Sequence, residues 1–291
     1  MTHGDFRRPV ALSDAGIWAL QFAGLPDDVA GLAEILQGLL IHEHMPGVYG
    51  VTLSDRQRGE PHVRGAAEIL ERIAVHDARP LSDARPPAER YAGCCRHYTL
   101  LHVAMLRSKG IAARARCGFG AYFTKGRYVD HWVTEYFDEA RRRWILADAQ
   151  IDDRQRALFG IEFHTMDVPR DRFVVAGDAW RLCRDGKADP QAFGVLEMAG
   201  LWFIASNVIR DVAALNNREM LPWDVWGAMT PVDAEIDLAF FDRLARLTRA
   251  PDSHLDELQA LYEDPRIAVP PTVFNAVLRR PEAVSPLVHS A

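Results

Sequence analysis

Apolar residues recur along the chain with spacings that differ from one segment to the next. Over residues 25–42 they return every three or four positions, which predicts an amphipathic helix, and residues 63–75 repeat this spacing. Residues 95–109 are apolar on nearly every side, so we expect a central, buried helix that ends at Gly110. The strands predicted after this helix cover residues 111–122, 128–137 and 142–149.

The second half of the chain has a weaker pattern. It predicts a strand over residues 173–176 and helices over residues 192–215, 234–249 and 253–262. After Asp264, five prolines and few apolar clusters predict a tail that wraps around the fold or frays. Near the start, residues 17–25 form a short apolar run, which we interpret as core-forming and not as a signal peptide.

Composition narrows the class of protein. The chain has 291 residues, enough for one large domain or two small ones, and its 48% hydrophobic and 25% charged content is ordinary for a soluble globular protein. A net charge of −6 without a basic stripe argues against a nucleic-acid partner. No stretch of 18 uncharged apolar residues is present, so no membrane association is expected. The cysteines have no spaced disulfide pattern, which favours free thiols in a reducing cytoplasm. They are Cys94, Cys95, Cys117 and Cys183.

The chemistry of the sequence centres on Cys95, which opens the buried helix. A thiol at the first turn of a helix meets unpaired backbone N–H groups and the positive end of the dipole, which lower its pKa. The same N–H groups can hold the oxyanion of a tetrahedral intermediate. A thiol nucleophile also needs a base and an acceptor that orients the base, and His131 and Asp148 follow within about fifty residues. These three are the predicted catalytic residues.

The positions of His131 and Asp148 can be tested by a pairing argument. If the two strands form a hairpin around residues 138–141, Phe137 opposes Arg142, and His131 faces Asp148 directly on one side of the sheet. A shift of one residue would put them on opposite sides.

Four sequence blocks around these residues resemble the transglutaminase-like superfamily, over about residues 91–152. The superfamily includes tissue transglutaminases, peptide N-glycanases, microbial proteases and bacterial biosynthetic homologues. The blocks are Gly-x-Cys-Arg at Gly93, Leu-x-x-x-Met-Leu-Arg-x-x-Gly-Ile-x-Ala-Arg at Leu101, His-Trp-x-x-Glu-Tyr at His131, and Trp-x-x-x-Asp at Trp144.

The resemblance implies the roles of the residues. Cys95 matches the nucleophile, His131 the base and Asp148 the orienting acid. The chain departs from the family at His97, where bacterial members often have an acidic residue, and at Ala112 and Ala149, where the family pattern has prolines.

The resemblance also implies an α+β fold, with a papain-like core in which the nucleophile helix packs on an antiparallel sheet. Extra helices are expected on both sides of this core. We expect an N-terminal helical part over residues 1–90, the catalytic core over residues 91–176 and a mainly helical extension over residues 177–291.

The expected function is cysteine-dependent acyl transfer or hydrolysis. The substrate would be an amide- or thioester-containing small molecule or peptide, with an amine as a possible acceptor, in the making of an amide-containing metabolite. No metal or organic cofactor is expected. Three alternatives stay open: a cysteine peptidase or amidase, an acyltransferase like the arylamine N-acetyltransferases, and a scaffold that retains the fold without turnover. The usual Arg-Gly-Gly of the N-acetyltransferases is absent here.

Four further residues are candidates for binding substrate. They are Tyr49, Gly93, Cys94 and Trp132. Gly93 would leave room for a substrate backbone to approach, and Cys94 competes with Cys95 for the role of nucleophile. The run His42-Glu43-His44 suggests a metal site, but two histidines at i and i+2 do not share a helix face, so we interpret it as structural.

Overall fold

The computed structural model describes residues 6–284. The chain divides into two compact units, each built from separate segments. Within the described residues, the N-terminal unit comprises residues 6–115 and 133–168, and the C-terminal unit comprises residues 116–132 and 169–284. The predicted catalytic core, residues 91–176, thus contributes to both units.

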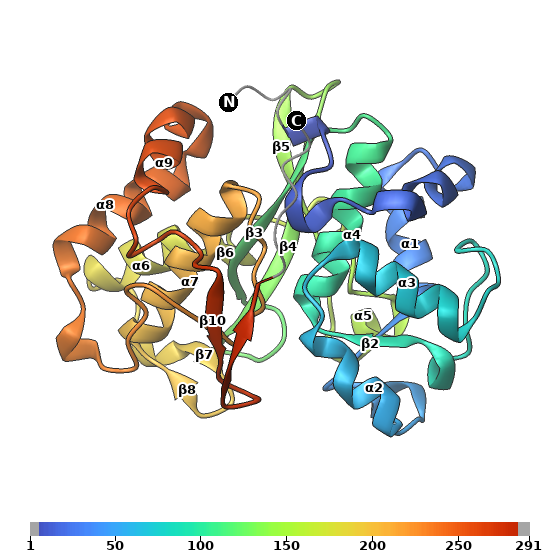
Figure 1. Cartoon of the computed structure of the whole chain (residues 1–291). Coiled ribbons are helices and arrows are strands. Elements are labelled where there is room, and N and C mark those ends of the chain that lie inside the picture. The colour runs from blue at the N-terminus through green and yellow to red at the C-terminus, as the bar shows by residue number, and fades with distance from the viewer. Residues whose placement is uncertain (1–5, 285–291) are drawn as a thin grey trace. The chain divides into compact units, whose positions relative to one another are not determined.

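The N-terminal unit contains five α-helices, counted over its described residues (Figure 1). They are α1 (Val29–Leu39), α2 (Asp55–Gly59), α3 (Ala66–His76), α4 (Cys95–Ser108) and α5 (Asp153–Phe159). Short 3-10 helices accompany them at Ala11–Ser13, Gly16–Gly24, Pro46–Tyr49, Glu60–His62 and Pro87–Glu89. The helices predicted over residues 63–75 and 95–109 are confirmed. Gly110 has a φ of +75° and ends α4 as a glycine in the left-handed region.

The helix predicted over residues 25–42 is shorter than expected. Its start is fixed by Asp28, whose side chain accepts a hydrogen bond from the Gly31 N–H at 2.9 Å. Its last three residues instead form strand β1 (Leu40–His42), which pairs in parallel with β2 (Tyr91–Gly93). The partner strand lies about fifty positions away in the sequence, so the local pattern could not reveal this pairing.

The apolar run over residues 17–25 does not form core along its length. It lies in a 3-10 helix in which only Phe22 is buried, while Ile17 and Leu20 are 78% and 83% exposed. A 3-10 helix has three residues per turn, so residues three apart lie above one another. Ile17 and Leu20 therefore share one exposed side.

Strands β4 (Tyr128–Asp138) and β5 (Arg143–Ala147) form the predicted hairpin, but in a different register. Phe137 pairs with Trp144, and the ladder ends where Thr134 pairs with Ala147. The predicted pair of Phe137 with Arg142 is wrong by two residues, because the four-residue turn covers residues 139–142 and not residues 138–141. Arg142, with a φ of +50°, lies in this turn. An even shift keeps each side chain on its predicted side of the strand, but Asp148 lies beyond the end of the ladder.

The C-terminal unit holds the remaining elements. Its α-helices are α6 (Ala176–Arg184), α7 (Leu201–Leu215), α8 (Leu238–Arg249) and α9 (Leu255–Leu261), and its 3-10 helices are Pro190–Ala192, Asp233–Glu235 and Pro251–Ser253. Its strands are β6 (Phe173–Val175), β7 (Phe193–Val195), β8 (Met198–Ala199), β9 (Asp224–Val225), β10 (Thr272–Asn275) and β11 (Arg280–Ala283). The strand predicted over residues 173–176 and the helices predicted over residues 234–249 and 253–262 are confirmed.

Two predictions for the C-terminal unit are wrong. The helix predicted over residues 192–215 begins only at Leu201, because β7 and β8 form a hairpin in front of it. At Gly194 a Cβ would lie 1.9 Å from the Met198 carbonyl oxygen, so only glycine permits this close pairing. The predicted tail after Asp264 contains the hairpin of β10 and β11, and β10 pairs with β9.

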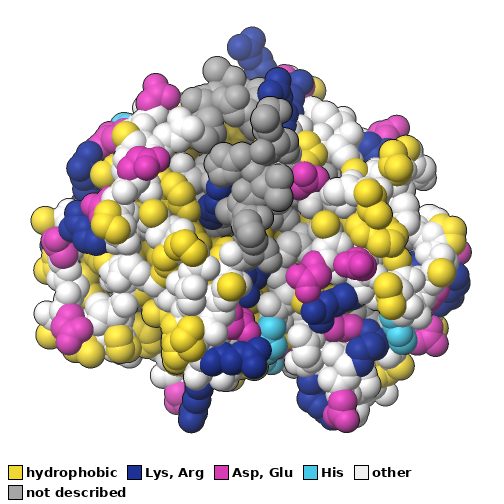
Figure 2. All heavy atoms as spheres, viewed as in Figure 1, with side chains coloured by type: hydrophobic (Ala, Val, Ile, Leu, Met, Phe, Trp, Pro, Cys, Tyr) yellow, Lys and Arg dark blue, Asp and Glu magenta, His cyan; other side chains and the backbone are white. Residues whose placement is uncertain are grey.

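The predicted α+β fold is confirmed. One sheet has the strand order β6-β3-β4-β7-β8, with β5 paired to β4 and β3 running over Ala113–Gly120. In this sheet β3 pairs antiparallel with β6, β4 with β5 and β7 with β8, whereas β4 and β7 are parallel. Positive and negative side chains are interspersed on the face that Figure 2 shows. Among the described residues, no helix is long and apolar enough to cross a bilayer.

Candidate active site

The strand before the nucleophile helix is braced within the N-terminal unit. On one side β2 pairs with β1, so that His42 lies opposite Gly93. On another side, the Glu60 carboxylate accepts the Ala92 N–H at 2.7 Å, and the Tyr91 hydroxyl donates to the Glu60 carbonyl at 2.6 Å. These bonds fix the direction in which the chain leaves β2 and enters α4.

Cys95 is the first residue of α4, as predicted. The helix is 14 residues long and buried from Cys95 to Arg107, so its N-terminus is shielded from bulk water. The thiol-bearing residue is 6% exposed, and Cys94 before it is 4% exposed. The unpaired N–H groups of the first turn favour an anion at this point.

Cys94 has an imidazole partner on its own helix. The Sγ atom of Cys94 lies 3.3 Å from Nδ1 of His97, and the Cys94 backbone nitrogen lies 3.1 Å from the same atom. Nε2 of His97 donates to the Val63 carbonyl at 3.1 Å. A neutral His97 thus caps the helix by accepting the Cys94 N–H at Nδ1, whereas a protonated His97 donates to a Cys94 thiolate.

The electrostatics of Cys94 favour the thiolate. Burial raises the pKa of the Cys94 thiol. The hydrogen bond with Cys95 and the charge and hydrogen bond of His97 lower it by more than burial raises it, so the pKa lies well below its ordinary value. The predicted competition between Cys94 and Cys95 therefore has a physical basis. The sequence did not show it, because it depends on how His97 turns back over the start of its own helix.

Gly93 is needed for a reason other than the one predicted. A Cβ at Gly93 would lie 2.9 Å from Cβ and 3.1 Å from Cγ of His97. The space beside this glycine is therefore filled by His97 and is not open for a substrate backbone. A contact between substrate and the Gly93 backbone stays a prediction.

Asp148 lies near one face of α4 in the N-terminal unit. Burial raises the pKa of Tyr98 well above its ordinary value, and Asp148 is among the charges that act on it. Burial lowers the pKa of His102 to about 4, and Asp148 opposes this shift. Because residues 95, 98 and 102 follow helical spacing, the charge of Asp148 acts on the side of α4 that carries Cys95.

The local bonds of Asp148 hold it at the end of β5. Its N–H donates to the Thr165 carbonyl at 2.7 Å, and its Oδ1 accepts the Gln150 N–H at 3.1 Å. Asp148 is 1% exposed.

His131 lies on β4 within the C-terminal unit. Its ring packs edge-on against Phe123, with centroids 4.8 Å apart, and also contacts the rings of Tyr122 and Phe173. The side chain is 3% exposed. The structure thus brings Cys95 and Asp148 into one unit and places His131 in the other, and their action as a triad stays a prediction.

Tyr49 and Trp132, the other two residues predicted to contact substrate, are held by contacts within the protein. The Tyr49 hydroxyl donates to Asp152 at 2.8 Å and accepts from Gln155 at 2.9 Å, so it ties its loop to the start of α5. The Trp132 side chain is 1% exposed and lies in the core. Contact of Tyr49 or Trp132 with substrate stays a prediction.

Three of the four sequence blocks meet in one buried cluster of the N-terminal unit. Arg114 donates from Nε to the Glu135 carboxylate at 2.7 Å, and both side chains are 1% exposed. The Arg114 guanidinium also lies over the Trp144 ring, 3.8 Å from its centroid. The motif residues outside the predicted triad therefore brace the fold.

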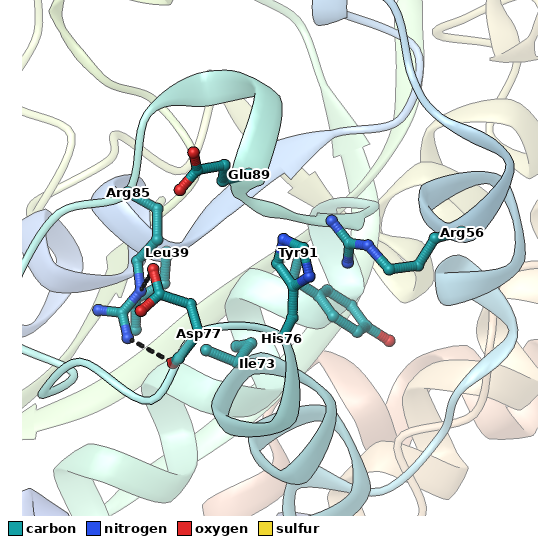
Figure 3. Close-up of a pocket in the computed structure, with 8 residues that line it drawn as sticks. All are labelled: Leu39, Arg56, Ile73, His76, Asp77, Arg85, Glu89 and Tyr91. Atoms are coloured by element: carbon teal, nitrogen blue, oxygen red, sulfur yellow. Dashed lines mark hydrogen bonds and ion pairs between the residues drawn. The ribbon is translucent and has the colours of Figure 1, made fainter.

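A small pocket in the N-terminal unit opens elsewhere and not onto the thiols. It is lined by Leu39, Arg56, Ile73, His76, Asp77, Arg85, Glu89 and Tyr91. Figure 3 shows Arg85 directed at Asp77. Because Arg85 donates to the carbonyls of Pro80, Asp83 and Arg79, it ties a loop together and is not free to hold a ligand.

Comparison with known proteins agrees with the sequence blocks. Residues 61–149 match the sequence model of the Transglutaminase-like superfamily. A solved structure of a candidate cysteine protease from Cytophaga hutchinsonii is 16% identical, with a TM-score of 0.35. The match covers 60% of this chain and 48% of that one, so the chain spans about half the length of that protein. No curated protein matches the chain. Residues 61–149 are thus a region like that of the transglutaminase-like superfamily.

Proposed function

We propose that this protein is a cysteine-dependent enzyme that transfers or hydrolyses an acyl group through Cys95. The observation that supports this most directly is the position of Cys95 at the first residue of a buried 14-residue helix. There, backbone N–H groups stabilise both a thiolate and the oxyanion that forms after its attack. The match of residues 61–149 to the superfamily also supports a cysteine-dependent enzyme, but it does not specify the reaction.

The proposed reaction has two halves. His131 takes the proton of the Cys95 thiol, and the thiolate attacks the carbonyl carbon of an amide or thioester. The C–N or C–S bond then breaks, the leaving group takes the proton from His131, and the acyl group stays on sulfur. In the second half an amine or water attacks this thioester, giving its proton to His131, and the Cys95 thiolate leaves. Asp148 orients His131 and stabilises its charged form.

The substrate class we propose is an amide- or thioester-containing small molecule or peptide. Synthesis of an amide-containing metabolite in the cytoplasm is consistent with four cysteines that are not in disulfides and with a negative net charge. The test below does not require the substrate, because thiol reactivity reports on the nucleophile itself.

Rates of alkylation by iodoacetamide near pH 7 test the proposal, with each modified cysteine identified by tandem mass spectrometry. Cys95 should react fastest. Cys183 serves as the internal reference, because burial raises its pKa to about 12. His131→Gln should slow the reaction of Cys95 and move its pH profile towards that of an ordinary thiol.

Two matched variants separate the adjacent thiols. Cys94→Ala should retain the fast reaction and Cys95→Ala should lose it. The opposite result would make Cys94, with His97 as its base, the nucleophile. A scaffold without turnover should show no fast cysteine in either variant.

A further inference from the structure

Glu43 lies beside the thiols, in a position that the proposed reaction does not use. It follows β1 directly, and its backbone N–H donates to the Gly93 carbonyl at 2.8 Å. This bond continues the parallel pairing of β1 with β2 by one residue, to the point where the chain reaches Cys94. The electrostatic interaction between Glu43 and Cys94 reflects this closeness.

One oxygen of the Glu43 carboxyl group lacks a hydrogen-bond partner among the described residues. This atom, Oε1, is buried and makes no hydrogen bond. Two fully buried carboxylates in the same unit are paired, since Glu60 accepts the Ala92 N–H and Glu135 accepts from Arg114. Buried polar atoms are nearly always satisfied, so an unpartnered one at a candidate active site calls for a partner from outside the protein.

The surroundings of Glu43 favour a positively charged partner. The thiol of Cys94 is held towards its anionic form by the contacts described above. A second negative charge at Glu43 is therefore opposed: burial raises the pKa of this carboxyl to about 8, and the charge of Cys94 adds to the shift. A cation placed between the two groups would relieve this opposition.

We propose that Glu43 recognises a positively charged nitrogen of the substrate, such as the ammonium group of an amine that accepts the acyl group. This inference rests on the proposed function, because it assigns the substrate class of the same site. Binding of the cation releases the carboxyl proton to solvent. The carboxylate can then take one proton from the ammonium, which leaves a neutral amine with a free lone pair for attack on the thioester.

The charge preference of the thiols tests this role. The probes are methanethiosulfonates with a trimethylammonioethyl, a sulfonatoethyl or a methyl group, whose charges do not change with pH. The ratio of the rates with the cationic and anionic probes reports the electrostatic potential at the thiol. The fraction of the attacking thiol that is ionised affects both rates equally and cancels in the ratio. In the wild-type protein this ratio should rise about tenfold between pH 6 and pH 9.5 as Glu43 ionises.

Matched variants assign the rise to one residue. Glu43→Gln should keep the ratio at its low-pH value, whereas Glu71→Gln, which removes an exposed carboxylate on α3, should retain the rise. Glu43→Asp should retain part of it, which guards against a folding defect in the glutamine variant. Subtracting the Glu43→Gln profile removes the contributions of the other groups near the probes, which are Cys94, Cys95, His97 and His42.

The outcomes separate this inference from the proposed function. If the neutral probe modifies Cys94 and Cys95 no faster than Cys183, the proposed nucleophile is wrong whatever the ratio. If the thiols are fast but Glu43→Gln and the wild-type protein give the same ratio at every pH, Glu43 does not recognise a cation.

Discussion

Two adjacent cysteines at one helix start differ in what surrounds them. Cys94 precedes the helix and has His97 as its partner, whereas Cys95 is the first helical residue. The sequence spacing predicted the position of Cys95 but not the partner of Cys94. That partner depends on the glycine that lets the His97 ring lie over the end of β2, and this is a packing relation and not a spacing.

Asp148 should affect reactivity more than stability. Asp148→Asn keeps the size of the side chain but removes the charge that would hold the imidazolium of His131, so turnover should fall by up to about 10⁴-fold. Before a substrate is known, a slower alkylation of Cys95 serves as the measurement, with thermal unfolding as the control. Unchanged alkylation in this variant would make Asp148 a structural residue.

Glu43 should also make stability depend on pH. Its pKa is raised from the usual 4.5 to about 8 in the folded protein, so between these values the folded state holds a proton that the unfolded state has lost. The free energy of unfolding should therefore fall as pH rises, by at most about 1.4 kcal/mol per pH unit from this group.

Glu43→Gln should lack this fall between pH 5 and pH 8. Urea unfolding of the wild-type protein and of Glu43→Gln at several pH values gives the free energy of unfolding of each. The difference between the two values cancels the contributions of all titrating groups that both proteins share. Parallel curves would show that the carboxyl is not protonated in the folded protein.

At the scale of elements, local pattern predicted helices better than strand pairing. Helix α4 follows its predicted bounds closely, because its spacing and its terminal glycine are both local signals. The register of β4 with β5 was missed by two residues, because the position of the four-residue turn is set by backbone angles such as that of Arg142. The hairpin of β7 and β8 was missed because its apolar residues fit a helical spacing equally well.

The junction of β2 with α4 should be intolerant of a side chain. Gly93→Ala places a methyl group 2.9 Å from Cβ of His97, and His97 cannot move without losing its bond to the start of α4. We expect a loss of about 1–3 kcal/mol in the free energy of unfolding.

The matched control is Gly59→Ala. Nothing lies within 4 Å of a Cβ at this position, so the substitution should leave stability unchanged or slightly raised. Equal effects of the two substitutions would show that the space beside Gly93 is not filled by His97.

At the scale of the whole molecule, each compact unit contains a fully buried pair of an arginine and a carboxylate. Arg114 pairs with Glu135 in the N-terminal unit, and Arg116 pairs with Asp211 in the C-terminal unit at 2.8 Å. The family blocks include Arg114 and Glu135, so the sequence marked both residues without showing that they meet. Asp211 lies outside the blocks, and nothing in the local pattern distinguished it from a surface residue of α7.

Breaking one pair should cost more than replacing both partners. Arg114→Met leaves the Glu135 charge buried without its counter-ion, which should cost about 3–5 kcal/mol in the free energy of unfolding. The double variant Arg114→Met with Glu135→Leu should recover most of this loss. Thermal and urea unfolding of the single and double variants measure it, and additive losses would contradict the pairing.

The pairing of β1 with β2 has a consequence for how the protein reaches its folded state. The two strands are about fifty residues apart in sequence, so the intervening chain must close a long loop before either strand has its partner. Until that loop closes, nothing shields the two neighbouring cysteines from dissolved oxygen. We therefore expect yields from refolding to depend on a reducing agent present early, and to become insensitive to it once the loop has closed.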